Sequence, residues 1–408
     1  MIELNFPNPV FTEKDPRGRR IFFGRQAEIE QIERTVLSGT RRPVIVLGER
    51  RSGKTSLQRV SADRLETQEQ GRLWPLFIEP QGIHSRDQLA QQILERLCSV
   101  LGTSLREAGL SEATGSVGQF VDAVANLIGP QNDRTALICV DEFETILDNS
   151  PQPEQDKILG LVTHIIEQTD LPLMFFLTMT GLAKSIQESY RSSFASVAEI
   201  IRLHPFDQET TQDMVTELLQ GQVVLPPAQM ARLFQLSGGH PYFSKLLLAK
   251  MLERYPLQEG KTLTVSEDML DQIVQDAARD PRADIAIKNI YQVHLDESEK
   301  SIVLLLAERG EHERLTLEEL SVVGISLKTA ARRLAQRDYL REHQDGSFGF
   351  HVGFLRDWLK DWIEFEEEQE RLELETLWQR LERQKDPWAG TEATVVTDED
   401  MRRFGLRP

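Results

Sequence analysis

The sequence predicts an α/β fold in which helices cover both faces of a parallel sheet, followed by helical modules. Five short apolar runs, typical of strands buried on both faces, alternate with helical patterns in the first half of the chain. After His204 the strand signals stop, and consecutive helical patterns follow. A glycine-containing turn joins the first apolar run to the next helix, which is where a phosphate site is expected in such folds.

The elements are expected in a definite order. Residues 21–37 predict an amphipathic helix whose apolar positions include Ile29, Ile32 and Val36. The next helix begins near Lys54. The five strands are predicted at residues 43–48, 73–78, 135–140, 171–178 and 198–203. Three helices, separated by Gly and Pro, are then predicted at residues 206–219, 227–237 and 240–255.

A third region, from about Leu263 to Lys360, carries a different pattern. Helices are predicted there at residues 266–278, 297–309, 315–321 and 327–339. Two short strands around the Asp345–Gly346 turn and a last helix from Val352 complete it. Helices followed by a small hairpin predict a winged helix.

Composition and charge limit the classes of function. A chain of 408 residues predicts two or three domains, and 40% hydrophobic with 27% charged residues excludes a mainly disordered or fibrous protein. No apolar run approaches the roughly 20 residues of a membrane-spanning helix, and the first residues lack a signal pattern, so a cytoplasmic protein without a membrane partner is expected. Cys98 and Cys139 fall in a predicted helix and strand and are expected to be reduced, structural thiols.

With a formal net charge of −18, the chain lacks the overall positive charge that is typical of nucleic-acid-binding proteins. Residues 361–400 hold fourteen acidic and four basic side chains, which gives −10 of that charge. Within this acidic segment, residues 364–384 predict a helix with an apolar stripe that either docks a partner or packs on its own chain; the stripe is Leu374, Leu377, Trp378 and Leu381.

The turn GERRSGKT at residues 48–55 matches the phosphate-binding pattern G-x-x-x-x-G-K-[ST]. Backbone N–H groups and the helix N-terminus would bind the phosphates of ATP, Lys54 would contact the β- and γ-phosphates, and Thr55 would offer a hydroxyl to Mg²⁺. The expected phosphate-binding residues are Gly48, Glu49, Arg50, Arg51, Ser52, Gly53, Lys54, Thr55 and Ser56.

An acidic pair follows another buried strand in ALICVDEFE, residues 136–144. Asp141 is expected to hold Mg²⁺, and Glu142 to orient or deprotonate the attacking water, so the pair predicts hydrolysis as well as binding. The strand LPLMFFLTMTG ends with Thr178 and Thr180. Thr180 is a candidate for contact with the γ-phosphate or the water, or else a residue that simply favours a strand end.

Together these residues resemble the STAND class of AAA-related P-loop ATPases, in particular archaeal-type members near the origin-recognition ATPases. The resemblance spans roughly residues 7–360 and is carried by FFGRQAE, GERRSGKTSL, CVDEFE, TMTG and SGGHPYF. It implies an extra strand between the strand of the phosphate turn and the Asp–Glu strand, then a helical lid and a winged helix. It also implies that Gly24 and Arg25 line the base pocket and that Pro241 lies against the adenine. Without the resemblance, Arg25 is interpreted as an exposed charge at a helix start. The GGHP segment is then the end of one helix followed by the start of the next.

The resemblance therefore predicts an α/β P-loop NTPase followed by a helical lid and a winged-helix domain. The expected parts are a P-loop ATPase domain at 1–204, a lid at 205–262, a winged helix at 263–362, and an acidic helix with a flexible tail at 363–408. In related proteins a winged-helix histidine senses the nucleotide, which makes His351 a candidate sensor or a core residue. Arg191 is either an arginine finger or a solvated helix charge.

Two functions remain open. In the first, the chain is an ATP-hydrolysing switch whose nucleotide state controls conformation, self-assembly or a protein partner. In the second, the winged helix binds DNA as in origin-recognition ATPases. The cations that would contact DNA lie along one predicted helix and are Lys328, Arg332, Arg333 and Arg337.

Overall fold

The computed structural model describes residues 22–365 except 41, 111–114, 130–132, 168–170, 181–197, 220–221, 257–260, 310–313 and 324. The chain divides into two compact units. The first contains residues up to Phe234 together with Gly239–Ser266, and the second contains Gln235–Gly238 and the residues from Glu267 onward. The two units are described separately below.

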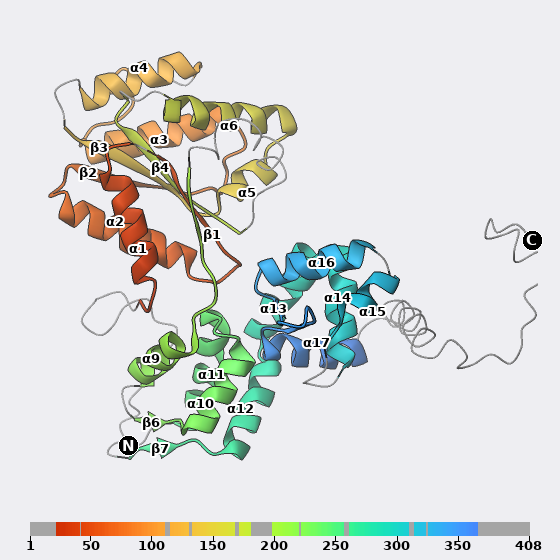
Figure 1. Ribbon diagram of the computed structural model, residues 1–408. Helices are drawn as coiled ribbons and strands as arrows, with labels where there is room; N and C mark the ends of the chain where they lie inside the picture. The colour runs from red at the N-terminus through yellow and green to blue at the C-terminus, as the bar shows by residue number, and fades with distance from the viewer. Residues whose placement is uncertain are drawn as a thin grey trace, which may run out of the picture. The chain divides into compact units, whose positions relative to one another are not determined.

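A five-stranded parallel sheet forms the centre of the first unit (Figure 1). Its strands are β1 (Val44–Leu47), β2 (Leu73–Ile78), β3 (Thr135–Val140), β4 (Leu173–Met179) and β5 (Glu199–Arg202). They lie in the order β2-β3-β4-β1-β5, and each neighbouring pair is parallel. The five predicted strands are confirmed. The extra strand expected between the P-loop strand and the Asp–Glu strand is β4.

Helices cover both faces of this sheet because alternate residues of each strand point to opposite sides. In β1, Ile45 and Leu47 join the apolar core formed with α3 (Arg86–Val100), α4 (Val117–Ile128), α5 (Phe143–Asp148) and α6 (Gln152–Glu167). Val44 and Val46 join the other core, formed with α1 (Gln26–Leu37) and α2 (Lys54–Gln68). A continuous apolar run such as β1 is therefore explained by burial on both faces.

The edge strand β2 carries a feature that limits pairing with other chains. Pro75 lies in the middle of β2, and a proline has no N–H to offer to a further strand. Phe77 on the same strand is 36% exposed. A proline on an edge strand of this kind is a common device against unwanted edge-to-edge association.

The first unit continues with three helices after the sheet. These are α9 (Gln208–Leu219), α10 (Pro227–Ser237), whose last three residues belong to the second unit, and α11 (Pro241–Arg254). They match the three predicted helices. A short parallel pair, β6 (Val223–Val224) with β7 (Leu263–Thr264), was not predicted, because two-residue strands leave no periodic signal.

The second unit consists of helices and one antiparallel hairpin. Its helices are α12 (Glu267–Ala278), α13 (Pro281–Asn289), the π-helix η1 (Ile290–His294), α14 (Glu297–Glu308), α15 (Leu317–Val323), α16 (Ile325–Gln336) and α17 (Gly353–Phe365). The hairpin pairs β8 (Leu340–Glu342) with β9 (Phe348–Phe350) around the predicted Asp345–Gly346 turn. The predicted helices and the hairpin are present, whereas α13 and η1 were missed.

A buried ion pair joins two helices of the second unit. The Arg309 guanidinium, 4% exposed, donates to both carboxylate oxygens of Glu319, at 3.0 and 3.2 Å. Burial alone would raise the pKa of Glu319, but the hydrogen bonds from Arg309 and from the Thr316 N–H lower it to about 2. The pair therefore stays ionised and fixes the start of α15 against the end of α14.

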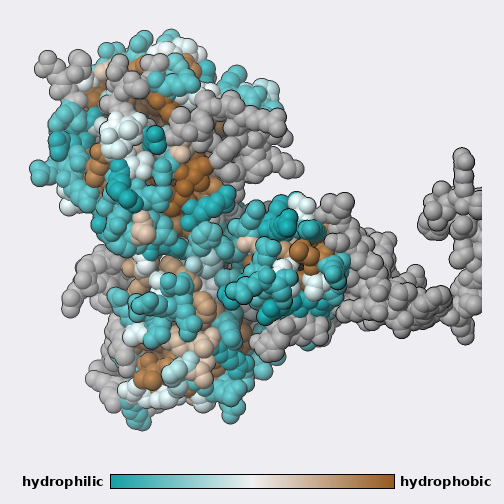
Figure 2. All heavy atoms as spheres, viewed as in Figure 1, coloured by the Kyte–Doolittle hydropathy of each residue, from teal (hydrophilic) through white to brown (hydrophobic). Residues whose placement is uncertain are grey.

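The visible surface is largely hydrophilic, as Figure 2 shows for the described residues. The large apolar side chains that are exposed among them lie on five different elements and are Leu37, Phe77, Val100, Val224 and Ile285. Single exposed apolar residues of this kind are normal on protein surfaces. In the part of the chain that the structure describes, no helix is both long enough and apolar enough to span a membrane.

Candidate functional site

The phosphate turn joins β1 to α2 with a helix start that no side chain caps. Gly53 is the N-cap residue of α2 and adopts a left-handed conformation with φ 97°. By contrast, Ser85 and Ser116 cap α3 and α4 by accepting N–H bonds from residues three positions ahead. The first N–H groups of α2 are thus left for an anion, as the predicted P-loop requires.

Lys54 and Thr55, the first two residues of α2, have different surroundings. Lys54 is only 5% exposed, and its ammonium donates to the carbonyl oxygens of Gly48 and Glu49, at 2.9 and 3.0 Å. The Thr55 hydroxyl donates to Asp141 Oδ2 at 2.7 Å. The structure thus brings the two predicted metal ligands, Thr55 and Asp141, into direct contact.

Thr178, near the end of β4, connects the acidic pair to the neighbouring strand. Its side chain is fully buried, and its hydroxyl donates to Asp141 Oδ1. The Thr178 hydroxyl oxygen also accepts the Glu142 N–H, at 3.0 Å. Glu142 has a left-handed backbone, φ 50°, at the N-cap of α5. Thr178 therefore orients both acids, a role that follows from the adjacency of β3 and β4.

Thr180, just after β4, contacts a carboxylate that the sequence reasoning missed. The Thr180 N–H donates to Glu144 Oε1 at 2.7 Å. Three buried side-chain atoms around Lys54 have no hydrogen-bond partner of good geometry, namely Ser52 Oγ, Glu144 Oε2 and Thr180 Oγ1. Buried polar atoms are normally paired, so unpaired ones gathered beside a P-loop lysine are expected where a polar ligand binds.

Burial and charge act in opposite directions on the two central ionisable groups. Burial lowers the pKa of Lys54, while nearby carboxylates, Glu144 foremost, favour its charged form. Burial raises the pKa of Glu144, while the Thr180 N–H and the Lys54 ammonium favour its charged form. The lysine and this glutamate therefore depend on one another for their charges.

The predicted base-contacting residues lie at the start of α1. Gly24 and Arg25 both have left-handed backbones, with φ 59° and 64°. The Arg25 guanidinium lies 4.6 Å from the centre of the Phe206 ring and donates to the His204 carbonyl at 2.7 Å. A side chain on Gly24 would meet Thr210 at 2.7 Å, so glycine is required here. Arg25 is therefore a packed residue and not a freely solvated charge.

Pro241 is the first residue of α11, after the N-cap residue His240. Its neighbour Tyr242 stacks on a residue of the phosphate turn: the Arg51 guanidinium lies 4.1 Å from the Tyr242 ring centre. This cation–π contact holds the start of α11 near the P-loop. Tyr242 was not singled out from the sequence, although it lies inside the quoted SGGHPYF motif.

The two glycines of this motif make different contacts. The Gly239 carbonyl accepts the Phe206 N–H at 2.9 Å, within the first unit. The Gly238 carbonyl lies 2.8 Å from His351 Nε2, within the second unit. A Cβ at Gly239 would lie 2.0 Å from the Phe206 carbonyl oxygen, so no other residue fits. His351 thus contacts the glycine motif, and burial lowers its pKa.

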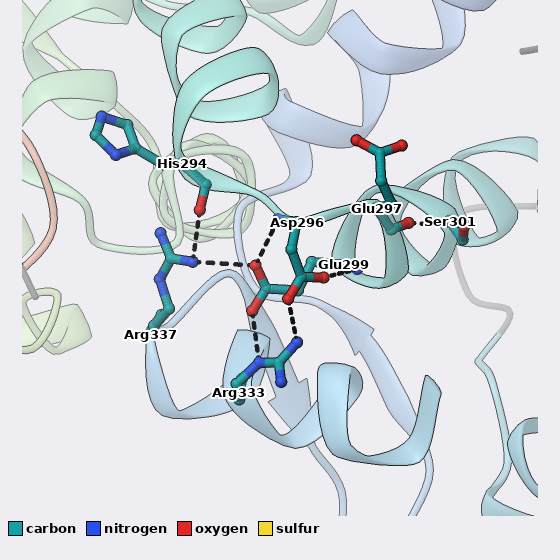
Figure 3. A network of polar contacts seen from close by, with 7 residues as sticks. All are labelled: His294, Asp296, Glu297, Glu299, Ser301, Arg333 and Arg337. Carbon is teal, nitrogen blue, oxygen red and sulfur yellow. Dashed lines mark hydrogen bonds and ion pairs between the residues drawn. The ribbon is translucent and has the colours of Figure 1, made fainter. Parts of the chain in front are cut away.

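Two of the four cations proposed to contact DNA are held by acids of their own unit (Figure 3). Arg333, on α16, pairs with Asp296 and with Glu299, the latter at 3.0 Å. Arg337 donates to the His294 carbonyl at 3.0 Å and to Glu299 at 3.3 Å. The Glu299 side chain is only 5% exposed. Because Arg333 and Arg337 are 43% and 26% exposed, these pairs are only partly buried, and removing one partner costs less than the about 3–5 kcal/mol of a fully buried pair.

The other two DNA candidates remain accessible: Arg332 is exposed and Lys328 is half-buried. Arg191 and the acidic helix at 364–384 lie outside the described residues, except for the first two residues of that helix, which end α17. Their proposed roles stay predictions.

The comparisons with known proteins agree with this geometry. A family model described as an ATPase domain predominantly from Archaea matches residues 22–246, more than half of the chain. No curated protein matches the sequence. Among solved structures, a Walker-type ATPase of Pyrococcus abyssi is similar, with a TM-score of 0.58 and 15% identity over 83% of this chain and 96% of that one.

The ORC2 protein of Aeropyrum pernix, solved in ADPNP–ADP complexes, has a TM-score of 0.54 and 14% identity over 92% of this chain and 98% of that one. At these identities the structural likeness shows the fold alone. The family match, together with the P-loop and the acidic pair beside it, assigns ATP hydrolysis to the chain. The chain belongs to the family of ATPase domains found predominantly in Archaea.

Proposed function

We propose that this ATPase is a nucleotide-operated switch of the STAND type. Residues 1–204 would bind and hydrolyse ATP, and residues 205–262 would form a lid. Residues 263–362 would form a winged helix, followed by an acidic helix and tail at 363–408. ATP and ADP would favour different arrangements of lid and winged helix. The nucleotide state would then control self-assembly or the binding of a protein partner.

The residues of the site fit Mg²⁺–ATP. Lys54 has a buried ammonium that can exchange backbone carbonyls for phosphate oxygens. Thr55 and Asp141 offer a hydroxyl and a carboxylate 2.7 Å apart, which is the oxygen donor set that Mg²⁺ prefers. When bound, Mg²⁺ would neutralise charge on the β- and γ-phosphates. Ser52 and Thr180 supply further hydroxyls without partners.

The observation that carries the switch is the junction between Gly238 and Gly239, one of the places where the chain passes between the units. Gly239 is bonded to Phe206, and Phe206 lies under Arg25, a proposed base contact. Gly238 is bonded to His351 of the second unit. A change beside the adenine would reach the Gly238–Gly239 junction through Phe206.

Hydrogen exchange and solution mass test the switch. We expect residues 235–241 and the peptide containing His351 to exchange at different rates with a non-hydrolysable ATP analogue and with ADP. The mass in solution is expected to change with the nucleotide as well. Lys54→Ala serves as the control and should show neither difference. Identical exchange and mass in the two nucleotide states would refute the switch.

A second candidate function is DNA binding through the winged helix, which the resemblance to origin-recognition ATPases implies. Arg332 and Lys328 on α16 support it because they lie on the helix that precedes the β8–β9 hairpin, where a winged helix carries its recognition helix. Arg333 and Arg337 support it less, because Asp296 and Glu299 already pair with them.

The structure sharpens the DNA experiment. Reversing all four charges would disrupt the Glu299 pairs, so a loss of binding could reflect unfolding. The informative variant is Lys328→Glu with Arg332→Glu, and the control with the same change in net charge is Arg42→Glu with Arg106→Glu, at exposed positions. If DNA binds α16, the first pair should weaken duplex binding at least tenfold and flatten its salt dependence. Equal affinity of both double variants, or no binding at low salt, would exclude this function.

A further inference from the structure

Glu144 lies at the centre of the ATPase site although it is neither part of the P-loop nor of the Asp141–Glu142 pair. It is in the first turn of α5, and its Oε1 accepts the Thr180 N–H at 2.7 Å. This bond joins the end of β3, through α5, to the end of β4. Thr178 makes a second link between the same strands. The peptide that joins Met179 to Thr180 is therefore held from two sides: the Gly48 N–H donates to the Met179 carbonyl at 3.2 Å, and Glu144 accepts the Thr180 N–H just after β4 ends.

The contacts of Glu144 do not fit a purely structural role. Its second oxygen, Oε2, is buried without a hydrogen-bond partner. The Thr180 hydroxyl lies near enough to this carboxylate to affect its charge, yet it too has no bond of good geometry. A half-satisfied buried carboxylate destabilises a fold.

The charge of Glu144 also acts on the lysine of the P-loop. Among the acids around Lys54, Glu144 has the strongest electrostatic effect, ahead of Glu49, Asp141 and Glu142. Glu144 thus contacts Thr180 and acts electrostatically on Lys54, and both side chains are proposed to contact the γ-phosphate. A displacement of about 1 Å at such a site can cost a hundredfold in rate.

We propose that Glu144 is a positioning residue of the ATPase site: its Oε1 holds the Thr180 main chain so that the Thr180 hydroxyl faces the transferred phosphate. The inference rests on the proposed roles of Thr180 and Lys54. Glu144 acts through Thr180 and does not itself react with the nucleotide. Its acceptor oxygen, not its charge, is the essential feature for turnover.

Two substitutions at Glu144 distinguish the role of its side-chain oxygen as a hydrogen-bond acceptor from the role of its negative charge. Glu144→Gln keeps an oxygen for the Thr180 N–H, and we expect its kcat to stay within about threefold of the wild type. Glu144→Ala removes the acceptor, and its kcat should fall about tenfold to a hundredfold while KM for ATP changes less than threefold. Glu66→Ala, at an exposed glutamate of α2, is the control for the glutamate-to-alanine change. An equal loss in both Glu144 variants would overturn the acceptor role.

A double-mutant cycle tests whether Glu144 acts through Thr180. Thr180→Val keeps the shape of the side chain and removes its hydroxyl, and it should lower kcat by a similar factor. Adding Glu144→Ala to Thr180→Val should then cause less than a twofold further loss, whereas multiplying losses would show independent roles and overturn the proposal. If Glu144→Ala alone folds poorly, Glu144→Gln decides the question: a kcat more than tenfold below the wild type would overturn the acceptor role.

The kinetic results distinguish a wrong role for Glu144 from a wrong assignment of the ATPase site. If Lys54→Ala abolishes hydrolysis while Glu144→Ala and Thr180→Val keep wild-type kcat, the nucleotide site stands and the positioning role of Glu144 is wrong. If hydrolysis survives Lys54→Ala as well, the site itself is misassigned.

Discussion

Replacing Lys54 by alanine is expected to weaken ATP binding at least about a hundredfold and to abolish measurable hydrolysis. The ammonium is 5% exposed and already donates two hydrogen bonds at about the geometry a phosphate would accept. Hydrogen bonds to charged groups contribute about 1.5–3 kcal/mol each, so losing two of them accounts for at least a hundredfold in affinity. Equilibrium titration with a fluorescent ATP analogue and an assay of phosphate release measure the two effects.

The control for this variant is Lys157→Ala, which removes an exposed lysine of α6 that pairs with Glu154. It should bind and hydrolyse ATP as the wild type does. Circular dichroism should accompany this variant, because it also removes the cation that favours the charged form of the buried Glu144. Wild-type turnover by Lys54→Ala would mean that the turn at residues 48–55 does not hold the phosphates.

Most of the nucleotide site was predictable because its residues follow strand ends. In an all-parallel sheet the carboxyl ends of the strands meet at one edge, so Lys54, Asp141 and Thr180 were expected to converge before any contact was known. The local signals were also strong: a glycine turn, an apolar strand and an acidic pair. The Thr55–Asp141 contact at 2.7 Å follows from these signals alone.

The roles of Thr178 and Glu144 were harder to predict because they depend on the order of strands. Thr178 meets Asp141 only because β4 lies between β1 and β3, an order that came from the family resemblance and not from periodicity. Glu144 resembled an ordinary acid in the first turn of a helix, where carboxylates are common. Its burial and its bond to Thr180 required the neighbouring strand to be placed.

In the second unit, a helix was predictable from the local sequence, whereas the ion pairs of its side chains were not. Three of the four predicted cations lie on α16, and Arg337 lies in the turn just after it. The acids that pair with Arg333, Asp296 and Glu299, lie more than thirty residues earlier in the chain. A local pattern of charges cannot reveal such a pairing. The missed helix α13, in contrast, had a local signal: Asp280 caps it and Pro281 occupies its first position.

Glu142→Gln is expected to lower kcat about a hundredfold to ten-thousandfold while leaving ATP binding within threefold of the wild type. The substitution keeps the size of the side chain but removes the carboxylate that would orient or deprotonate the attacking water, a contribution of about 10²–10⁴ in rate. The backbone should not change, because the Thr178 hydroxyl accepts the N–H of residue 142 whichever side chain is present. Single-turnover hydrolysis and equilibrium ATP binding separate the two effects.

The ATP-bound form of Glu142→Gln should therefore accumulate, which makes this variant the best state in which to detect nucleotide-dependent assembly. Glu66→Gln, at an exposed site on α2, is the matched control and should turn over normally. If Glu142→Gln kept the wild-type kcat, another carboxylate would have to activate the water. Glu144 is then the residue to examine, because among the acids near Lys54 it is the one whose pKa burial raises and whose second oxygen has no partner. A loss of turnover in Glu144→Gln under that condition would move the base from residue 142 to residue 144 and replace the positioning role argued above with a catalytic one.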